Sequence, residues 1–301
     1  MKKVKYKTSV SRIIFMVFAV AFLILVLFVS VIPLWHVIMG SISNPTATTT
    51  SRSLILYPLR NVDFQAYAII GRYQRLWSGY LNTFIYIVMQ CALTGLLVTI
   101  AGYIFSRKRF RLRNAFMLFI SATMLFNGGM IPMYMIVRNL KLLDTRGAMV
   151  LPAAIGVFNI IMMRTAMEGI PEALEEAARI DGAGELTTMF KIILPLCKAT
   201  FAVIMLFTAV GKWNDYMSAL LYLPNRTDLY PLQMVLRTIL FNISSATQDM
   251  AAQTNGKDSV TMYQKSIEYA VIVVSTLPVL CIYPFVQKYF VSGVTLGAVK
   301  S

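Results

Sequence analysis

The chain has 301 residues, of which 57% are hydrophobic and only 14% are charged. Soluble domains contain about 25% charged residues, so this composition excludes an ordinary soluble domain and indicates a membrane protein. The net charge of +15 does not indicate nucleic-acid binding, because the basic residues lie beside apolar stretches, where positive charge sets membrane topology.

Six stretches are apolar enough to be membrane spans, since a helix needs about 20 apolar residues to cross a bilayer. Strands of a barrel would be about ten residues long and alternating, so helices are expected. The sequence therefore predicts an all-α polytopic membrane protein with six transmembrane helices. In chain order the spans are Ile13–Ile32, Tyr80–Phe105, Asn114–Val137, Gly147–Met163, Ala199–Gly211 resuming over Met217–Leu223, and Tyr269–Val286.

The spans divide the chain into segments. The first span is too long for the apolar core of a signal peptide and lacks a small-residue cleavage site, so we expect it to be retained. The predicted segments are a cytoplasmic N-terminus (1–12), a first transmembrane helix (13–40), an external loop (41–79), a permease core of five helices (80–291) and a cytoplasmic tail (292–301). Within the core, 168–195 is predicted to be a cytoplasmic loop and 223–268 an external loop.

Lys and Arg set the expected orientation. With the N-terminus inside, the cytoplasmic segments hold 16 Lys/Arg in 70 residues, and the outer segments hold 12 in 113 residues. The bias is strongest in the short loop Ser106–Arg113, SRKRFRLR. Both termini are therefore predicted to be cytoplasmic.

Several spans contain helix breakers. They are Asn127-Gly128-Gly129 ahead of Pro132, Pro152, and Pro278 with Pro284. Such residues bend a membrane helix and free backbone carbonyls. Either they only adjust packing, or the bent helices line a cavity that opens and closes.

The segment Pro171–Pro195 is the one strongly acidic, helix-capable stretch of the chain. Six of the thirteen carboxylates lie between positions 168 and 185. Pro171 suits the first turn of a helix, and Gly182 and Gly184 can end it. A second helical pattern follows over Glu185–Ile193. A helix lying on the bilayer surface would favour Lys and Arg, so two short helices that dock onto another protein are the better interpretation.

Lys212 and Asp215 stand at i,i+3 in the outer part of the fifth span, so they can face each other on a helix. Charged groups at membrane depth either line a cavity or pair internally. A translocation path built from Lys212, Trp213, Asn214, Asp215 and Tyr216 is one interpretation, with an aromatic ring stacking on sugar. An internal ion pair with Trp213 at the membrane interface is the other.

Glu176-Ala177-Ala178, then Gly182, then Ile192-x-Leu194-Pro195 resembles the EAA loop of binding-protein-dependent ABC import permeases. Trp213-Asn214-Asp215-Tyr216 resembles an element of the sugar-uptake branch. The ending Gly293–Lys300 is similar to that of the maltose-type permease.

This resemblance implies a type I ABC importer permease fold in the bacterial cell membrane. It also implies a second, homologous permease as heterodimer partner, two cytoplasmic ATP-binding subunits and an extracellular solute-binding lipoprotein. In maltose-type systems the membrane sugar site belongs mainly to the other permease. The positions implied to couple to the ATPase are Glu172, Ala173, Glu175, Glu176, Ala177, Ala178, Asp181, Gly182, Ala183 and Gly184.

No ATP-binding loop is readable in the chain. The Gly-Lys pairs Gly211-Lys212 and Gly256-Lys257 lack the Ser/Thr and the upstream glycine of that motif. We therefore expect no enzyme activity, no cofactor and no metal. The predicted function is the permease subunit of an ATP-dependent importer of sugars, favouring oligosaccharides. The alternatives are a non-sugar solute, a secondary transporter, which the near absence of intramembrane carboxylates disfavours, or a membrane scaffold without transport.

Overall fold

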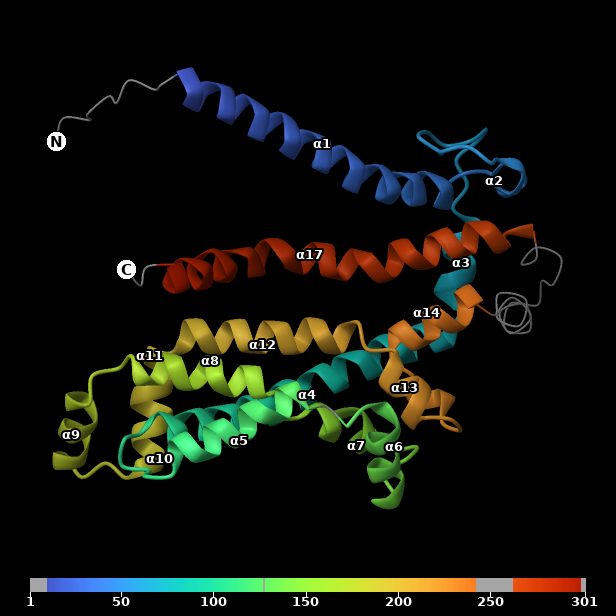
Figure 1. Ribbon diagram of the computed structural model, residues 1–301. Helices are drawn as coiled ribbons and strands as arrows, with labels where there is room; N and C mark the ends of the chain where they lie inside the picture. The colour runs from blue at the N-terminus through green and yellow to red at the C-terminus, as the bar shows by residue number, and fades with distance from the viewer. Residues whose placement is uncertain (1–9, 127, 242–261, 299–301) are drawn as a thin grey trace. The chain divides into compact units, whose positions relative to one another are not determined.

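The computed structural model describes residues 10–126, 128–241 and 262–298, without the side chains of 282, 283 and 285–298 (Figure 1). All regular elements of these residues are helices. The chain forms two compact units, one of residues 1–73 and 242–274 and the other of residues 74–241 and 275–301. Asn127, the polar run Asn242–Lys257 and the last three residues lie outside the described residues.

The first unit begins with a long apolar helix, α1 (Val10–Ser41). It begins before the predicted span 13–32 and ends after it. The later end arises because the apolar run continues through Pro33 to residue 41. The segment predicted as an external loop, 41–79, contains α2 (Pro45–Thr50) and α3 (Gln65–Arg72). The side chain of His36 accepts a hydrogen bond from the backbone N–H of Ile55 at 2.9 Å, which is a structural role.

Three helices are long and apolar enough to cross a membrane by themselves. They are α1, α4 (Gln74–Ser106) and α17 (Gln264–Ala298), whose apolar part reaches Cys281. Helix α17 continues through Pro278 and Pro284 to residue 298, so most of the predicted tail 292–301 is helical.

The other three predicted spans are bent pairs of helices, which brings the number of spans to as many as six. Gly129, with φ +87°, separates α5 from α6, so the span predicted over 114–137 is interrupted at a helix breaker read from the sequence. A bend of 53° precedes α8, and one of 85° at Cys197 precedes α12. The pairs are α5 (Arg113–Leu125) with α6 (Met130–Asn139), α7 (Arg146–Val150) and η1 (Leu151–Ala153) with α8 (Val157–Glu168), and α10–α11 (185–196) with α12 (Lys198–Trp213).

Prolines account for two of the breaks. Pro152 lies in η1 next to the 53° bend. Pro195 lacks the N–H that would bond to the carbonyl of Lys191 in an α-helix. The turn before it is a π-helix, η2 (Thr188–Ile193), between α10 (Glu185–Thr187) and α11 (Leu194–Leu196). The bend beside Pro152 agrees with a helix breaker read from the sequence, whereas Pro195 was not among those breakers.

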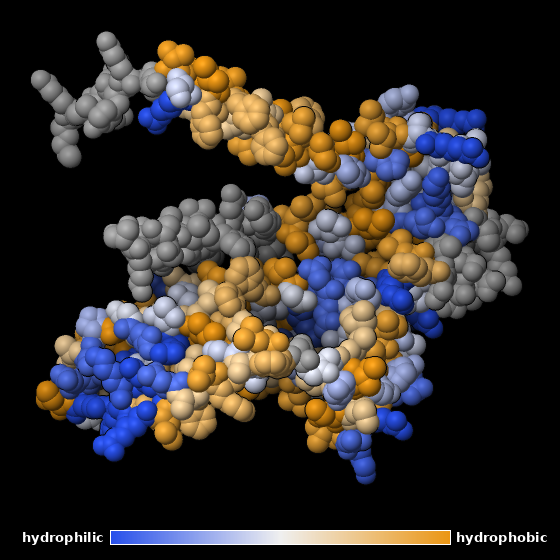
Figure 2. Space-filling view, in the orientation of Figure 1, coloured by the Kyte–Doolittle hydropathy of each residue, from blue (hydrophilic) through white to orange (hydrophobic). Residues whose placement is uncertain are grey.

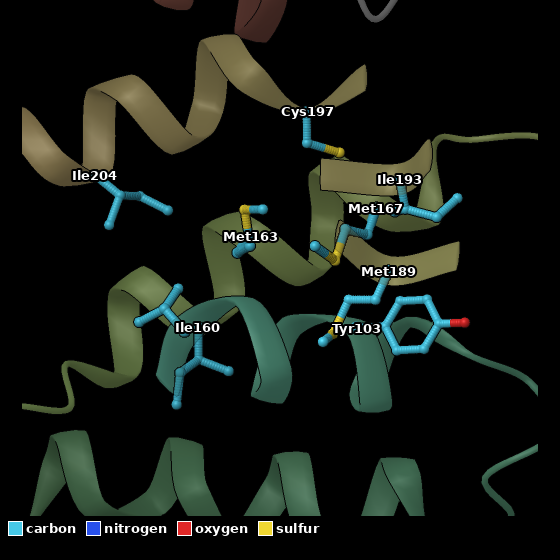
Figure 3. Packing of buried hydrophobic residues seen from close by; sticks show 9 residues of the cluster. Tyr103, Ile160, Met163, Met167, Met189, Ile193, Cys197 and Ile204 are labelled. Carbon is cyan, nitrogen blue, oxygen red and sulfur yellow. The ribbon is translucent and has the colours of Figure 1, made fainter. Parts of the chain in front are cut away.

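Helix α4 is the centre of the second unit. It packs against α8 and α12, and glycines let these helices approach closely. A Cβ built on Gly102 would lie 2.9 Å from Cγ of Met163 and 3.3 Å from the backbone N of Arg164. The buried cluster around this contact joins four segments of the chain (Figure 3), namely Val98, Tyr103, Ile160, Met163, Met167, Met189, Ile193, Cys197 and Ile204.

The first part of the predicted external loop 223–268 is packed structure. It follows α13 (Met217–Tyr222) and contains η3 (Thr227–Leu229) and α14 (Leu232–Phe241). Polar side chains of α4 form hydrogen bonds with the backbone of this segment. The hydroxyl of Tyr86 donates to the carbonyl of Leu229 at 2.8 Å. The N–H of Leu232 donates to Oγ1 of Thr83 at 2.8 Å. Residues 227–229 and 232–241 of this predicted loop are therefore helical.

We expect Gly102→Leu to separate α4 from α8. Because the new side chain meets Met163 and a backbone nitrogen, overpacking should cost about 1–3 kcal/mol. The thermal unfolding of the purified chain measures this. The control is Gly71→Leu, since a Cβ on Gly71 meets nothing within 4 Å. Equal unfolding temperatures for the two variants would contradict the close approach.

Candidate functional site

The acidic segment forms a short amphipathic helix, α9 (Ala173–Ile180), with Glu172 at the N-cap position but without a side-chain capping hydrogen bond. The carbonyl of Pro171 accepts from the N–H of Leu174 at 3.2 Å, so the helix begins two residues after the proline rather than at it. Glu175 and Glu176 lie in the first turn and Arg179 in the last. These charges complement the helix dipole.

Gly182 ends α9 in a Schellman motif. The N–H of Ala183 donates to the carbonyl of Ala178 at 2.8 Å, and the N–H of Gly182 donates to that of Arg179 at 3.0 Å. This closure requires a left-handed backbone conformation at the residue directly after the C-cap residue Asp181. Gly182 occupies that position and has φ +79°. The glycine bend predicted from the sequence is therefore confirmed at Gly182, whereas Gly184 has an extended conformation with φ −71°.

The inner face of α9 is fastened to the end of α4 by a buried ion pair between Glu175 and Arg107. Their side chains are 9% and 13% exposed. The guanidinium of Arg107 also lies 4.8 Å from the centre of the Tyr103 ring, a cation–π contact. Ala178, one turn after Glu175, is buried on the same face of α9.

Exposed ion pairs surround this buried one. Lys108 Nζ lies 2.9 Å from Oε1 of Glu172, and Arg109 Nη1 lies 3.5 Å from Oε1 of Glu185. The hydroxyl of Tyr103 donates to the other oxygen of Glu185 at 2.8 Å. Glu172, Glu175 and Glu185 are therefore paired within the chain.

The pKa values of Glu175 and Glu172 shift in opposite directions, for different reasons. Burial raises the pKa of Glu175, although the neighbouring Arg107 acts to lower it. A hydrogen bond from Lys108 lowers the pKa of Glu172. The contribution of Glu172 to stability is therefore present above its unfolded pKa and lost as the pH falls through its lowered folded pKa, whereas acidification favours the folded state at Glu175.

The outer face of α9 is free to meet another protein. Figure 2 shows hydrophilic residues gathered over α9 and α10. Ile180 is 86% exposed, and Glu176, Ala177 and Asp181 are exposed beside it. Among the described residues, Glu176 and Asp181 have no salt-bridge partner. A Cβ on Gly182 would meet nothing within 4 Å, so the chain itself does not require a small residue there.

The second group of predicted site residues lies at the end of α12. Lys212 Nζ is 2.7 Å from Oδ2 of Asp215, which confirms that the two face each other. Lys212 is buried and also donates to the carbonyl of Met149. Trp213 lies against Tyr80, with ring centres 6.3 Å apart.

A cavity of about 410 Å³ opens beside this ion pair. It includes Lys212 and Asp215 but not Trp213, Asn214 or Tyr216. Its lining comes from α4, the α7–α8 break and the α12–α13 region, namely Gln90, Ala153, Gly156, Asn159, Phe207, Thr208, Gly211, Lys212, Asp215 and Ser218. Gln90 and Asn159 were not among the site residues predicted from the sequence, because neither belongs to a recognisable motif.

Up to six spans in the part of the chain that the structure describes, three of them bent, are typical of a polytopic membrane protein. The profile of the family described as "Binding-protein-dependent transport system inner membrane component" matches residues 95–296. The chain belongs to this family.

Two relatives come from Bacillus subtilis (strain 168). The chain is 38% identical to the polygalacturonan/rhamnogalacturonan transport system permease protein YtcP, over 93% of this chain and 96% of that one. It is 37% identical to the protein LplC, over 90% of each. It is also 26% identical to the arabinooligosaccharides transport system permease protein AraQ of Halalkalibacterium halodurans, over 91% of this chain and 92% of that one.

A solved structure has the same fold. It is the crystal structure of a bacterial ABC transporter involved in the import of the acidic polysaccharide alginate. The TM-score is 0.86 at 32% identity, covering 95% of this chain and all of the matched chain. The type I importer permease fold expected from the EAA resemblance is therefore confirmed.

Removal of one member of the buried ion pair should loosen α9. We expect Arg107→Met to destabilise the attachment of α9 by about 3 kcal/mol, because Glu175 is left buried without its partner. Hydrogen–deuterium exchange of the amides of residues 173–180 measures this in the full chain.

The matched control is the double variant Arg107→Met with Glu175→Leu. An apolar pair of similar volume leaves no buried charge, so its exchange should return toward that of the wild type. Additive effects of the two substitutions would contradict a pairwise contact.

Proposed function

We propose that this chain is the translocating subunit of an ATP-dependent oligosaccharide importer, and that segment 168–195 is where a cytoplasmic ATPase docks. The observation that carries this is the outer face of α9, which stays exposed while the inner face is fixed by Arg107. A helix that is fixed on one face and exposed on the other is suited to receive force from another protein.

The names of the relatives support a saccharide as cargo. One is named for polygalacturonan and rhamnogalacturonan, another for arabinooligosaccharides, and the matched solved structure for alginate import. These sugars differ in charge but share a chain of several units. An oligosaccharide is therefore the cargo proposed for this protein.

The energy comes from partner subunits, because the chain carries no ATP-binding loop. We infer a heterodimer with a second permease, two ATP-binding subunits and an external solute-binding lipoprotein. Closure of the ATPases would displace α9, and the ion pair with Arg107 would pass the displacement to α4. Because α4 packs on α8 and α12, the bent spans would then move together between inward-open and outward-open states.

The proposed topology puts both termini and α9 on the cytoplasmic side. It rests on the density of Lys and Arg, which is highest in the loop Ser106–Arg113. The ion pairs of Lys108 and Arg109 with the acidic segment support it, since both segments must then lie on one side of the membrane.

Substitution of Gly182 tests the docking surface. Asn tolerates the left-handed conformation but adds bulk, whereas Ala adds little bulk and is strained there. If an ATPase approaches Gly182 closely, Gly182→Asn should lower ATP-driven uptake at least about tenfold. Gly182→Ala should then retain more uptake than Gly182→Asn.

The assay uses proteoliposomes that contain the permease, its partner permease and the ATPases, with binding protein added. Co-purification of the ATPase is the second readout, and the amount of chain in the membrane should be unchanged. Wild-type uptake by Gly182→Asn, or a larger loss in Gly182→Ala, would mean that the glycine serves only the backbone turn.

A further inference from the structure

The cavity beside Lys212 lies where two spans are interrupted. Residues 154–156 separate η1 from α8, and residues 214–216 separate α12 from α13. Interrupted membrane helices leave backbone groups available and commonly form the binding sites of transporters. The volume of about 410 Å³ falls in the range of about 300–1,000 Å³ typical of small-ligand sites.

Gln90 lines this cavity and carries a buried side-chain acceptor without a partner among the described residues. Its side chain is buried, and Nε2 donates to the carbonyl of Ala153 at 2.7 Å and to Oγ1 of Thr94 at 3.1 Å. Thr94 in turn donates to the carbonyl of Ala154 at 2.9 Å, which fixes the orientation of the amide. Within the part of the chain that the structure describes, Oε1 of Gln90 has no hydrogen-bond partner. Such buried acceptors are rare, and a ligand hydroxyl would satisfy this one.

The charged groups of the cavity are already matched. The ammonium of Lys212 binds the carbonyl of Met149 and Oδ2 of Asp215. Oδ1 of Asp215 accepts from the N–H of Ser218 at 3.0 Å. A ligand carboxylate entering the cavity would be repelled by the carboxylate of Asp215. Among the lining residues, no unpaired cation is available to bind it. The other polar lining residues, Asn159 and Thr208 among them, are uncharged.

We propose that this cavity binds an uncharged, hydroxyl-rich part of the saccharide during its passage. The inference rests on the proposed function and deepens it, since it assigns a substrate contact to this chain itself. Gln90 and the uncharged side chains exchange hydrogen bonds with hydroxyl groups. The Lys212–Asp215 pair gives the cavity no net charge, so the site does not select acidic sugars.

Gly211 offers a way to fill the cavity without disturbing the fold. It lies in α12, lines the cavity, and a Cβ built on it would meet nothing within 4 Å. Ala, Leu and Phe at this position form a series of increasing volume. Gly in a helix interior is less favourable than Ala, so the smallest change should not destabilise α12.

The experiment measures ATP-driven uptake by the complete reconstituted transporter. The probe is a mixture of neutral arabino-oligosaccharides and oligogalacturonides, and mass spectrometry identifies the species that enter. Gly211→Ala should retain most uptake, and Gly211→Phe should lower it at least about tenfold. Stimulation of the ATPase by the binding protein should persist, because α9 is unchanged.

The matched control is Val210→Phe, the neighbouring position on α12, which is exposed and does not line the cavity. It should transport like the wild type. Equal uptake by Gly211→Phe and Val210→Phe would overturn the cavity proposal while leaving the importer intact. Absence of any ATP-driven uptake by the wild type would remove the proposed function, and the cavity proposal with it.

A second variant tests the charge of the site. Asp215→Asn keeps an oxygen for the N–H of Ser218 but leaves Lys212 without its carboxylate. The uptake of oligogalacturonides relative to arabino-oligosaccharides should then rise several-fold. An unchanged ratio would show that the ion pair does not set the neutrality of the path and would overturn that part of the proposal.

Discussion

The ion pair between Arg107 and Glu175 joins the membrane-spanning part of the second unit to its polar helix. Removing two charges from water is costly, and burial indeed raises the pKa of Glu175. The pair is therefore a poor source of stability but a precise point of attachment. Without it, the basic loop and the acidic segment would be joined by the exposed ion pairs of Lys108 and Arg109, which contribute little and are screened by salt.

Helix α4 connects this attachment with the cavity. Gln90 lies on α4, whose last residue, Ser106, is about 24 Å further along the helix at 1.5 Å per residue, and Arg107 follows directly after it. Gly102 lies between them, at the close contact with α8. A helix packed in this way transmits displacement rather than absorbing it, whereas the breaks beside α8 and α12 are where the backbone can change direction.

Much of the fold could be predicted from the sequence, because apolar length determines where helices can cross a membrane. The EAA pattern and the turn at Gly182 were also readable, since they depend on local residues. The pairing of Arg107 with Glu175 was missed, although the basic and acidic segments were both predicted to be cytoplasmic and their opposite charges were a usable signal. The packing of α14 and the role of Gln90 depend on contacts across more than 60 residues, which one sequence does not reveal.

The pairing of Glu172, Glu175 and Glu185 within the chain has a consequence for engineering. The EAA stretch is not a portable module. A graft of that stretch from another permease would bring carboxylates selected against a different basic loop, and its helix would sit on mismatched charges. A working chimaera must exchange Ser106–Arg113 together with the EAA stretch, because the two segments are complementary in charge and function as one unit.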